Sequence, residues 1–314
     1  MQRLTEGTTN FEPLSPEAFG TDIQQIVMPL FKRDGENLVP IGTGFIVGGD
    51  ALMMTAKHVV EDARSSRQRV IGSDGRWTDL GDFYAFYFSA ERHGPNNEFN
   101  LGGLWPIEKV WFTADTDIAF CWLKAAERDG VRITFKRMPI SPGLPKLNEE
   151  ITAFGYHGLS KPLRLGANGE LVLPYDCRGS FATGRIIEVH PLRRDWLLPS
   201  PCFRTTARFD HGMSGGPVVN ANGFVCGVIW SSLGRNPNSE EHTSYVSMLW
   251  PVMGAKIDVA PEQGAMPVPT SILQLVRSGY IASDGSEQAI EIVTSPEGEG
   301  VRVNAPPDWR ARPA

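Results

Sequence analysis

A serine flanked by glycines is the feature of this chain that most directly points to chemistry. Ser214 lies in the run Gly212-Met213-Ser214-Gly215-Gly216-Pro217. Glycine has no Cβ, so it lets a backbone turn sharply and approach a ligand closely. A serine on such a turn presents its hydroxyl beside backbone N–H groups, and acyl transfer needs both a nucleophile and donors for the oxyanion that it creates. A glycine-rich β-turn with an incidental serine has the same local sequence, so the interpretation depends on whether the chain also supplies a base.

His58 is the best candidate for that base among the six histidines, because it closes the run Thr55-Ala56-Lys57-His58 at the end of an apolar, strand-like segment over 51–56. Asp117 is the candidate for a group that orients the imidazole, because it immediately precedes the apolar run 118–123. A charge beside a buried segment is costly unless it is paired. A carboxylate that accepts the second ring N–H of a histidine is such a pair, whereas Asp115 is more easily interpreted as a surface acid.

Short strands must position these three residues. The chain contains 33 glycines and 24 prolines spread along its length, which favours turns over long helices. In the first half we expect a short helical turn over 57–62 and strands at 26–32, 41–47, 51–56, 83–88, 107–112 and 118–123. In the second half we expect strands at 150–156, 170–173, 180–190, 202–207, 217–219, 224–231 and 244–249. Regularly spaced short strands predict an all-β barrel or sandwich.

The pattern changes outside these two strand sets. Residues 124–146 have the composition of a connector, with Pro139, Pro142 and Pro145. Beyond residue 254 we expect only a short helix over 271–277 and a strand over 289–293, followed by a frayed end over 295–314.

Bulk composition excludes several classes of function. The chain has 314 residues, which predicts about two domains, and its 41% hydrophobic content is sufficient for a buried core. A net charge of −6 gives no basic field for nucleic acid or an anionic membrane. No apolar run approaches the ~20 residues of a membrane span, and the first residues lack the apolar region of a signal peptide. We therefore expect a cytoplasmic protein that binds neither nucleic acid nor membrane.

The four cysteines do not have the CxxC spacing of a zinc site. Cys121 and Cys226 lie in apolar runs and are expected to be free buried thiols. Cys177 and Cys202 lie in less regular sequence, where a disulfide between them and two free thiols are both open.

Three segments in order along the chain resemble the signature segments of trypsin-like, chymotrypsin-fold serine proteases. They are Thr55-Ala56-Lys57-His58, Asp117-Ile118-Ala119 and Gly212-Met213-Ser214-Gly215-Gly216-Pro217, and the resemblance covers roughly residues 23–255. It implies an all-β fold of two packed six-stranded β-barrels with the active site between them. The expected division is an N-terminal arm over 1–22, a first barrel with His and Asp over 23–140, a second barrel with Ser over 141–255, and a short C-terminal extension over 256–314.

The resemblance also implies roles for these residues. Ser214 would attack the scissile carbonyl, His58 would accept and return the proton, and Asp117 would orient the imidazole. The backbone N–H groups of Gly212 and Ser214 would form the oxyanion hole. The implied protein is a serine endopeptidase that acts on protein or peptide substrates without cofactor or metal. The alternative is a latent or non-catalytic binding module of the same fold, in which a regulatory protein partner orders the oxyanion loop.

Gly212 to Gly216 also matches G-x-S-x-G, the nucleophile elbow of α/β-hydrolases. That elbow needs a helix after the serine, and then an acid and a histidine further along the chain. Here Pro217 and the following valines favour extended chain, and the only later histidine is His242, whose only preceding acids after Ser214 are its neighbours Glu240 and Glu241. The elbow is therefore disfavoured.

The substrate pocket departs from the best-known family members. Met213 stands where digestive enzymes carry an aspartate that pairs with a newly cut N-terminus, so activation by that route is not expected. Arg208 lies six residues before the serine, where the family often places the base of the S1 pocket. It would suit an acidic P1 side chain if it points inward; otherwise it is a solvated surface residue. His211 is a further substrate-binding candidate with the same two alternatives. The expected substrate-pairing strand is Trp230-Ser231-Ser232.

Overall fold

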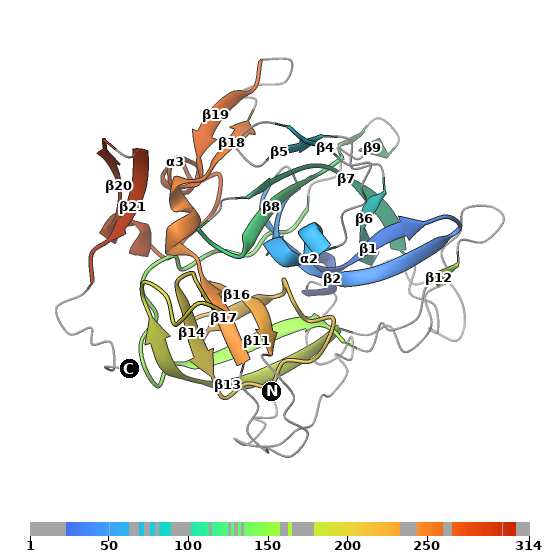
Figure 1. The fold of residues 1–314 in the computed structure, drawn as a ribbon. Helices are drawn as coiled ribbons and strands as arrows, with labels where there is room; N and C mark the ends of the chain where they lie inside the picture. Colours follow the sequence, from blue (N-terminus) through green and yellow to red (C-terminus); the bar gives the residue numbers. More distant parts are fainter. Residues whose placement is uncertain are drawn as a thin grey trace.

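The structure of the chain is a computed structural model. It describes residues 23–49, 51–62, 69–71, 76–78, 82–88, 102–112, 115–124, 127–128, 131–132, 135–157, 163–164, 179–232, 244–259, 266–296 and 298–305. Strands dominate these residues, and they form two barrels that lie one above the other in Figure 1, with a C-terminal extension against one side.

The first barrel is a closed ring of six strands. They are β1 (Val27–Asp34), β2 (Asn37–Gly48), β3 (Leu52–Ala56), β6 (Phe83–Phe88), β7 (Gly102–Phe112) and β8 (Ile118–Leu123). The order around the ring is β7-β6-β1-β2-β3-β8, and pairing of β7 with β8 closes it. The helix α2 (Lys57–Asp62) directly follows β3. The short strands β4 (Arg69–Ile71) and β5 (Arg76–Thr78) extend the sheet from β7, and β12 (Leu163–Arg164) pairs with β2.

The second barrel also closes with six antiparallel strands. They are β11 (Glu150–Tyr156), β13 (Gly179–His190), β14 (Cys202–Thr205), β15 (Pro217–Asn220), β16 (Val225–Ser232) and β17 (Ser244–Met248). The ring order is β11-β13-β14-β17-β16-β15. The predicted all-β fold of two six-stranded barrels is therefore confirmed. The strand expected at 170–173 lies outside the described residues.

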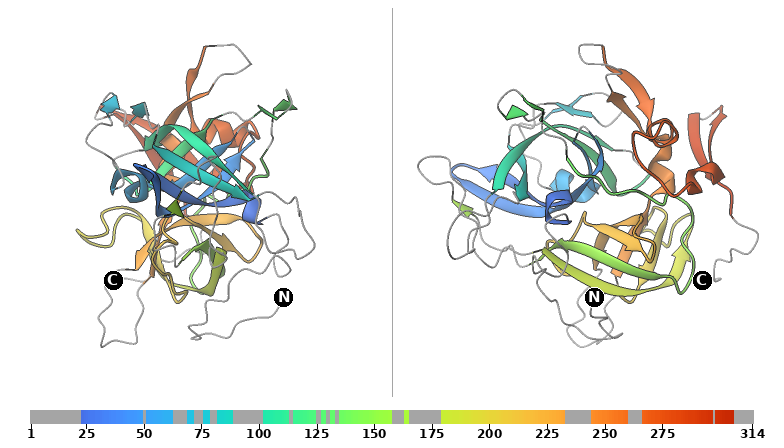
Figure 2. Two further views of the ribbon diagram at one scale, coloured as in Figure 1. Left: turned by 90° about the vertical axis from the view of Figure 1, so that its right-hand side faces the viewer. Right: turned by 180° about the vertical axis from the view of Figure 1, so that it is seen from behind.

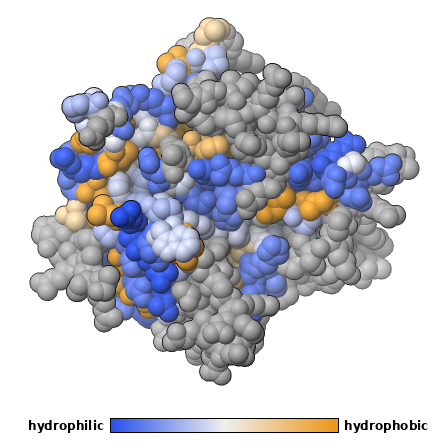
Figure 3. Space-filling view, viewed as in Figure 1, coloured by the Kyte–Doolittle hydropathy of each residue, from blue (hydrophilic) through white to orange (hydrophobic). Residues whose placement is uncertain are grey.

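Burial explains why these segments become strands. All residues of β3, β15 and β17 are buried, and five of the six residues of β8 are buried as well. The second barrel has its own apolar core, while a larger core cluster spans the first barrel and the C-terminal extension. On the face shown in Figure 3, hydrophilic residues are interspersed with smaller apolar areas.

The C-terminal extension is more ordered than the sequence indicates. The 3-10 helix η1 (Trp250–Gly254) precedes it. The extension itself comprises β18 (Lys256–Val259), β19 (Val268–Ser271), α3 (Ile272–Arg277), η2 (Ser286–Ala289), β20 (Ile290–Ser295) and β21 (Gly298–Val303). The predicted helix is confirmed, and Ser271 and Gln274 form a capping box at its start. The prediction that 295–314 would fray is wrong for β21, because this strand pairs with β20 along its whole length.

The extension also contacts the connector between the barrels. In that connector β9 (Glu127–Arg128) and β10 (Val131–Arg132) form a small hairpin. Further along, Ile140 bridges both Val225 of the second barrel and Ser283 of the extension, and Ile281 bridges Gly48 at the end of β2. The views in Figure 2 show the extension beside both barrels. None of the helices in the described ranges is long and apolar enough to cross a membrane.

Replacement of Ile281 by alanine tests whether the extension belongs to the barrel core. Ile281 is fully buried in the large core cluster, so Ile281→Ala is expected to lower the free energy of unfolding by about 2–5 kcal/mol in urea titrations. Met266 in the same extension is 83% exposed, and Met266→Ala should change the free energy of unfolding by less than about 0.5 kcal/mol. Equal, small effects of both substitutions would contradict a shared core.

Candidate active site

The turn that carries Ser214 accepts only glycine at two of its positions. Gly212 has φ +95° and Gly215 has φ +86°, both in the left-handed region that favours glycine. A Cβ on Gly212 would collide with the carbonyl oxygen of Tyr156, and one on Gly215 would collide with that of Thr43. The turn is therefore pressed against strands of both barrels, β11 and β2.

Backbone hydrogen bonds fix this turn at several points. The N–H of Met213 donates to the carbonyl oxygen of Asp210 at 3.1 Å. The N–H of Gly215 donates to that of Ile229 at 2.9 Å, and the N–H of Gly216 to that of Met213 at 2.9 Å. By contrast, the N–H groups of Gly212 and Ser214 donate to no acceptor among the residues that the structure describes. Two adjacent donors thus remain available on the turn that presents the Ser214 hydroxyl.

His58 and Asp117 are held together by the register of β3 and β8. Ala56 at the end of β3 pairs with Ile118 at the start of β8, so the residues just beyond this pair lie side by side. The Asp117 carboxylate accepts the backbone N–H of His58 at 2.9 Å through Oδ1 and contacts His58 Nδ1 at 2.7 Å through Oδ2. Asp117 is only 9% exposed. An Nδ1 proton directed at this carboxylate would leave Nε2 as the basic nitrogen.

Strand β2 brings the serine turn next to the segment that carries His58. A Cβ on Gly42 would lie 2.8 Å from Val59 Cγ1 and 2.9 Å from the carbonyl oxygen of Ser214. One on Gly215 would lie 3.0 Å from the backbone nitrogen of Ala56. The three residues that the sequence singled out therefore belong to segments that meet where the two barrels join.

Arg208 lies beside a carboxylate. Its Nε is 3.4 Å from Asp210 Oδ1, and both side chains are 24% exposed. His211 is exposed, whereas the intervening Phe209 is buried in the core of the second barrel. Arg208 is thus half-buried rather than fully solvated, and Asp210 offsets part of its charge.

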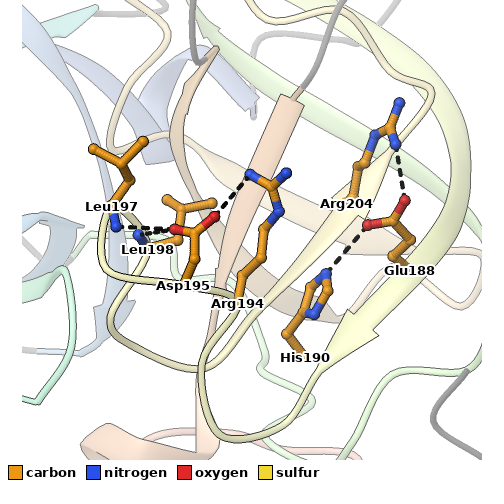
Figure 4. Close-up of polar contacts among 7 residues, drawn as sticks. All are labelled: Glu188, His190, Arg194, Asp195, Leu197, Leu198 and Arg204. Atoms are coloured by element: carbon orange, nitrogen blue, oxygen red, sulfur yellow. Dashed lines mark hydrogen bonds and ion pairs between the residues drawn. The ribbon is translucent and has the colours of Figure 1, made fainter. Parts of the chain in front are cut away.

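Trp230, Ser231 and Ser232 end β16, where the two serines pair with Tyr245 and Ser244 of β17. Trp230 is partly buried and packs against a small cluster that contains Leu198. The loop bearing Leu198 is shaped by Asp195, whose carboxylate accepts the N–H groups of Leu197 and Leu198 at 2.9 and 3.0 Å (Figure 4). Beside this loop, Glu188 bonds Arg204 at 2.8 Å and His190 at 3.2 Å. The Asp195 contacts therefore fix the loop whose Leu198 belongs to the cluster beside Trp230.

Two residues near the turn were not singled out from the sequence. Thr43 is fully buried and bonds the turn through both backbone and side chain. His157 follows β11 next to Gly212 and contacts the Ser180 hydroxyl through Nδ1. Burial lowers the pKa of His157, and the charge of Asp210 partly opposes this shift. Neither residue lies in a distinctive motif, so only their spatial position reveals them.

The described cysteines are poor candidates for a nucleophile. Cys121, Cys202 and Cys226 are free and buried, and burial raises the pKa of the Cys202 thiol to about 12. Cys177, the candidate disulfide partner of Cys202, lies outside the described residues. In the part of the chain that the structure covers, no three His, Cys, Asp or Glu side chains gather as a metal site.

Two closed β-barrels with a glycine-rich serine turn at their junction define the architecture of a chymotrypsin-like peptidase. The chain belongs to the trypsin-like peptidase domain family, whose model matches residues 42–228. This match includes His58, Asp117 and Ser214 and confirms the resemblance inferred from the sequence.

Two solved protease structures are among those that match the chain, both at low sequence identity. The protease domain of MamO from Magnetospirillum magneticum, in its apo form, is 15% identical with a TM-score of 0.47, over 72% of this chain and 92% of that chain. The Rv3671c protease, in an inactive form, is 16% identical with a TM-score of 0.42, over 75% of this chain and 91% of that chain. Among curated protein sequences, no significant match to the chain was found.

The depressed pKa of His157 predicts a pH dependence of stability. As pH falls below the ordinary histidine value of 6.5, the unfolded chain takes up a proton that the folded protein does not, so the free energy of unfolding decreases. His157→Gln keeps a hydrogen-bonding side chain but does not titrate, and should weaken this decrease in urea titrations across that region. An identical pH slope in both proteins would contradict the assignment to His157.

Proposed function

We propose that the protein is a serine endopeptidase in which Ser214 is the nucleophile, His58 the general base and Asp117 the residue that orients it. The observation that carries this proposal is the double contact of the Asp117 carboxylate with His58, at 2.9 Å to its backbone N–H and 2.7 Å to Nδ1. Such an arrangement fixes both the position and the tautomer of the imidazole.

The remaining steps follow from groups on the serine turn. Ser214 Oγ attacks the substrate carbonyl while Nε2 of His58 takes the hydroxyl proton and then delivers it to the leaving amine. The N–H groups of Gly212 and Ser214 stabilise the oxyanion of the tetrahedral intermediate. Water then hydrolyses the acyl-enzyme with His58 again acting as the base. The proposed substrates are proteins or peptides.

A fluorophosphonate probe tests the proposed nucleophile. The serine oxygen displaces fluoride from phosphorus, so only an activated serine reacts. Wild-type protein should be labelled and should digest casein, whereas Ser214→Ala should abolish both. Asp117→Asn should reduce the labelling rate by about 10⁴-fold, because it removes the carboxylate that orients His58.

Ser278→Ala is the matched control, since Ser278 lies in the extension and its hydroxyl donates to the carbonyl oxygen of Leu275 in its own helix; it should label like wild type. Absence of labelling in a folded wild-type protein would reject the enzyme and favour the latent or binding module.

We also propose that Arg208 contacts the P1 side chain and favours an acidic residue there. Its support is the half-buried position of Arg208, six residues before Ser214 and beside Asp210. A charge-assisted hydrogen bond to a P1 carboxylate is worth about 1.5–3 kcal/mol, although Asp210 competes for the same guanidinium.

Peptide-library cleavage tests this specificity. Arg208→Ala should lower the preference for acidic over neutral P1 residues by about tenfold or more. Arg204, which pairs with Glu188 on the same barrel, provides the control, and Arg204→Ala should leave the P1 profile unchanged. An unaltered profile in Arg208→Ala would reject the proposed role of Arg208.

A further inference from the structure

Thr43 of β2 uses all of its polar groups at the junction of the barrels. It is fully buried. Its N–H donates to the carbonyl oxygen of Ser214 at 2.8 Å, and its carbonyl oxygen accepts the Thr55 hydroxyl at 2.7 Å. Its own hydroxyl donates to the carbonyl oxygen of Gly212 at 2.8 Å and accepts the N–H of Tyr156 at 3.0 Å. One side chain thus joins β2, β11 and the serine turn.

The hydroxyl of Thr43 fixes the peptide unit between Gly212 and Met213. One end of this unit, the Gly212 carbonyl, is bonded by Thr43, and the other end, the Met213 N–H, donates to Asp210. With this peptide held, the backbone torsions of Gly212, among them its φ of +95°, determine where the N–H of Gly212 points.

The second donor of the proposed oxyanion hole is fixed in another way. The N–H of Ser214 shares a peptide unit with the carbonyl of Met213, which accepts the N–H of Gly216 at 2.9 Å. This bond is entirely backbone. The Gly212 donor therefore depends on a side chain, and the Ser214 donor does not.

Thr43 also links the serine turn to strand β11, against which the turn packs. A Cβ on Gly212 would collide with the carbonyl oxygen of Tyr156, so these two backbones are in close contact. Because the Thr43 hydroxyl bonds both residues, it sets their relative position. A shift of either would move the N–H of Gly212.

We propose that Thr43 is a positioning residue for the oxyanion hole, acting through the backbone of Gly212. This inference rests on the proposed serine endopeptidase activity. The hydroxyl holds one oxyanion donor in place, while His58 and Asp117 are held by their own hydrogen bonds to each other. Loss of the hydroxyl should weaken stabilisation of the transition state and leave the titration of the base unchanged.

The test compares Thr43→Val, which has nearly the same shape but no hydroxyl, with Thr43→Ser, which retains it. The second-order rate of fluorophosphonate labelling is measured as a function of pH, because the phosphoryl oxygen of the probe takes the place of the carbonyl oxygen. Thr43→Val should lower the maximal labelling rate, reached on the plateau of the pH profile, by about tenfold to a hundredfold. The apparent pKa of that profile should stay the same. Thr43→Ser should restore the rate to within about threefold of wild type.

A control separates this effect from general destabilisation. Ser271→Ala removes the buried cap of α3, far along the chain in the extension, and should lower the melting temperature without changing the labelling rate. Circular dichroism confirms that each variant is folded at the assay temperature. If Thr43→Val does not fold, Thr43→Cys, with its weak S–H donor, serves instead and should show the same direction of change.

The outcomes distinguish the two proposals. Wild-type labelling rates in Thr43→Val, together with loss of labelling in Ser214→Ala, would overturn the role of Thr43 and leave the enzyme intact. A shifted apparent pKa with an unchanged plateau would also overturn it, because the effect would then lie on the base. A folded wild-type protein that does not react with the probe would overturn both.

Discussion

The close approach of β2 to the serine turn is the constraint on which the rest of the structure depends. The N–H of Thr43 donates to the carbonyl oxygen of Ser214. A Cβ on Gly42 or Gly215 would displace neighbouring atoms. Two barrels packed through ordinary side chains would hold their backbones further apart. The small residues at this point let a loop of the second barrel lie directly on a strand of the first, so the geometry of the site becomes part of the packing between barrels.

A buried carboxylate provides the second fixed point. Asp117 is removed from water almost completely, and a buried charge is tolerated only when it is paired and hydrogen-bonded. Two contacts to His58 satisfy this need. The pairing of β3 with β8 places both residues at the same edge of the sheet, so their alignment follows from strand register rather than from a flexible loop.

The C-terminal extension completes the scaffold. Its buried residues Ile272, Ile281 and Ile290 belong to the same apolar cluster as the first barrel, and Ile140 of the connector bridges both the extension and the second barrel. The extension therefore stabilises the connection between the two halves that share the site. The strand predicted over 289–293 is confirmed as β20. Its partner β21 escaped prediction because it is largely exposed, with a polar and glycine-rich sequence that carries little strand signal.

The sequence by itself determined the all-β class, most strand positions in both barrels, the family, and the candidates His58, Asp117 and Ser214. Apolar runs, turn residues and motif order are local properties, and β8 and β11 were predicted at their observed bounds. Only the tertiary structure decided which residues support the serine turn. Thr43 and His157 have ordinary local sequences, and the pairing of Arg208 with Asp210 depends on a loop conformation. The bond between Thr43 and Gly212 joins residues 169 positions apart, which no local pattern encodes.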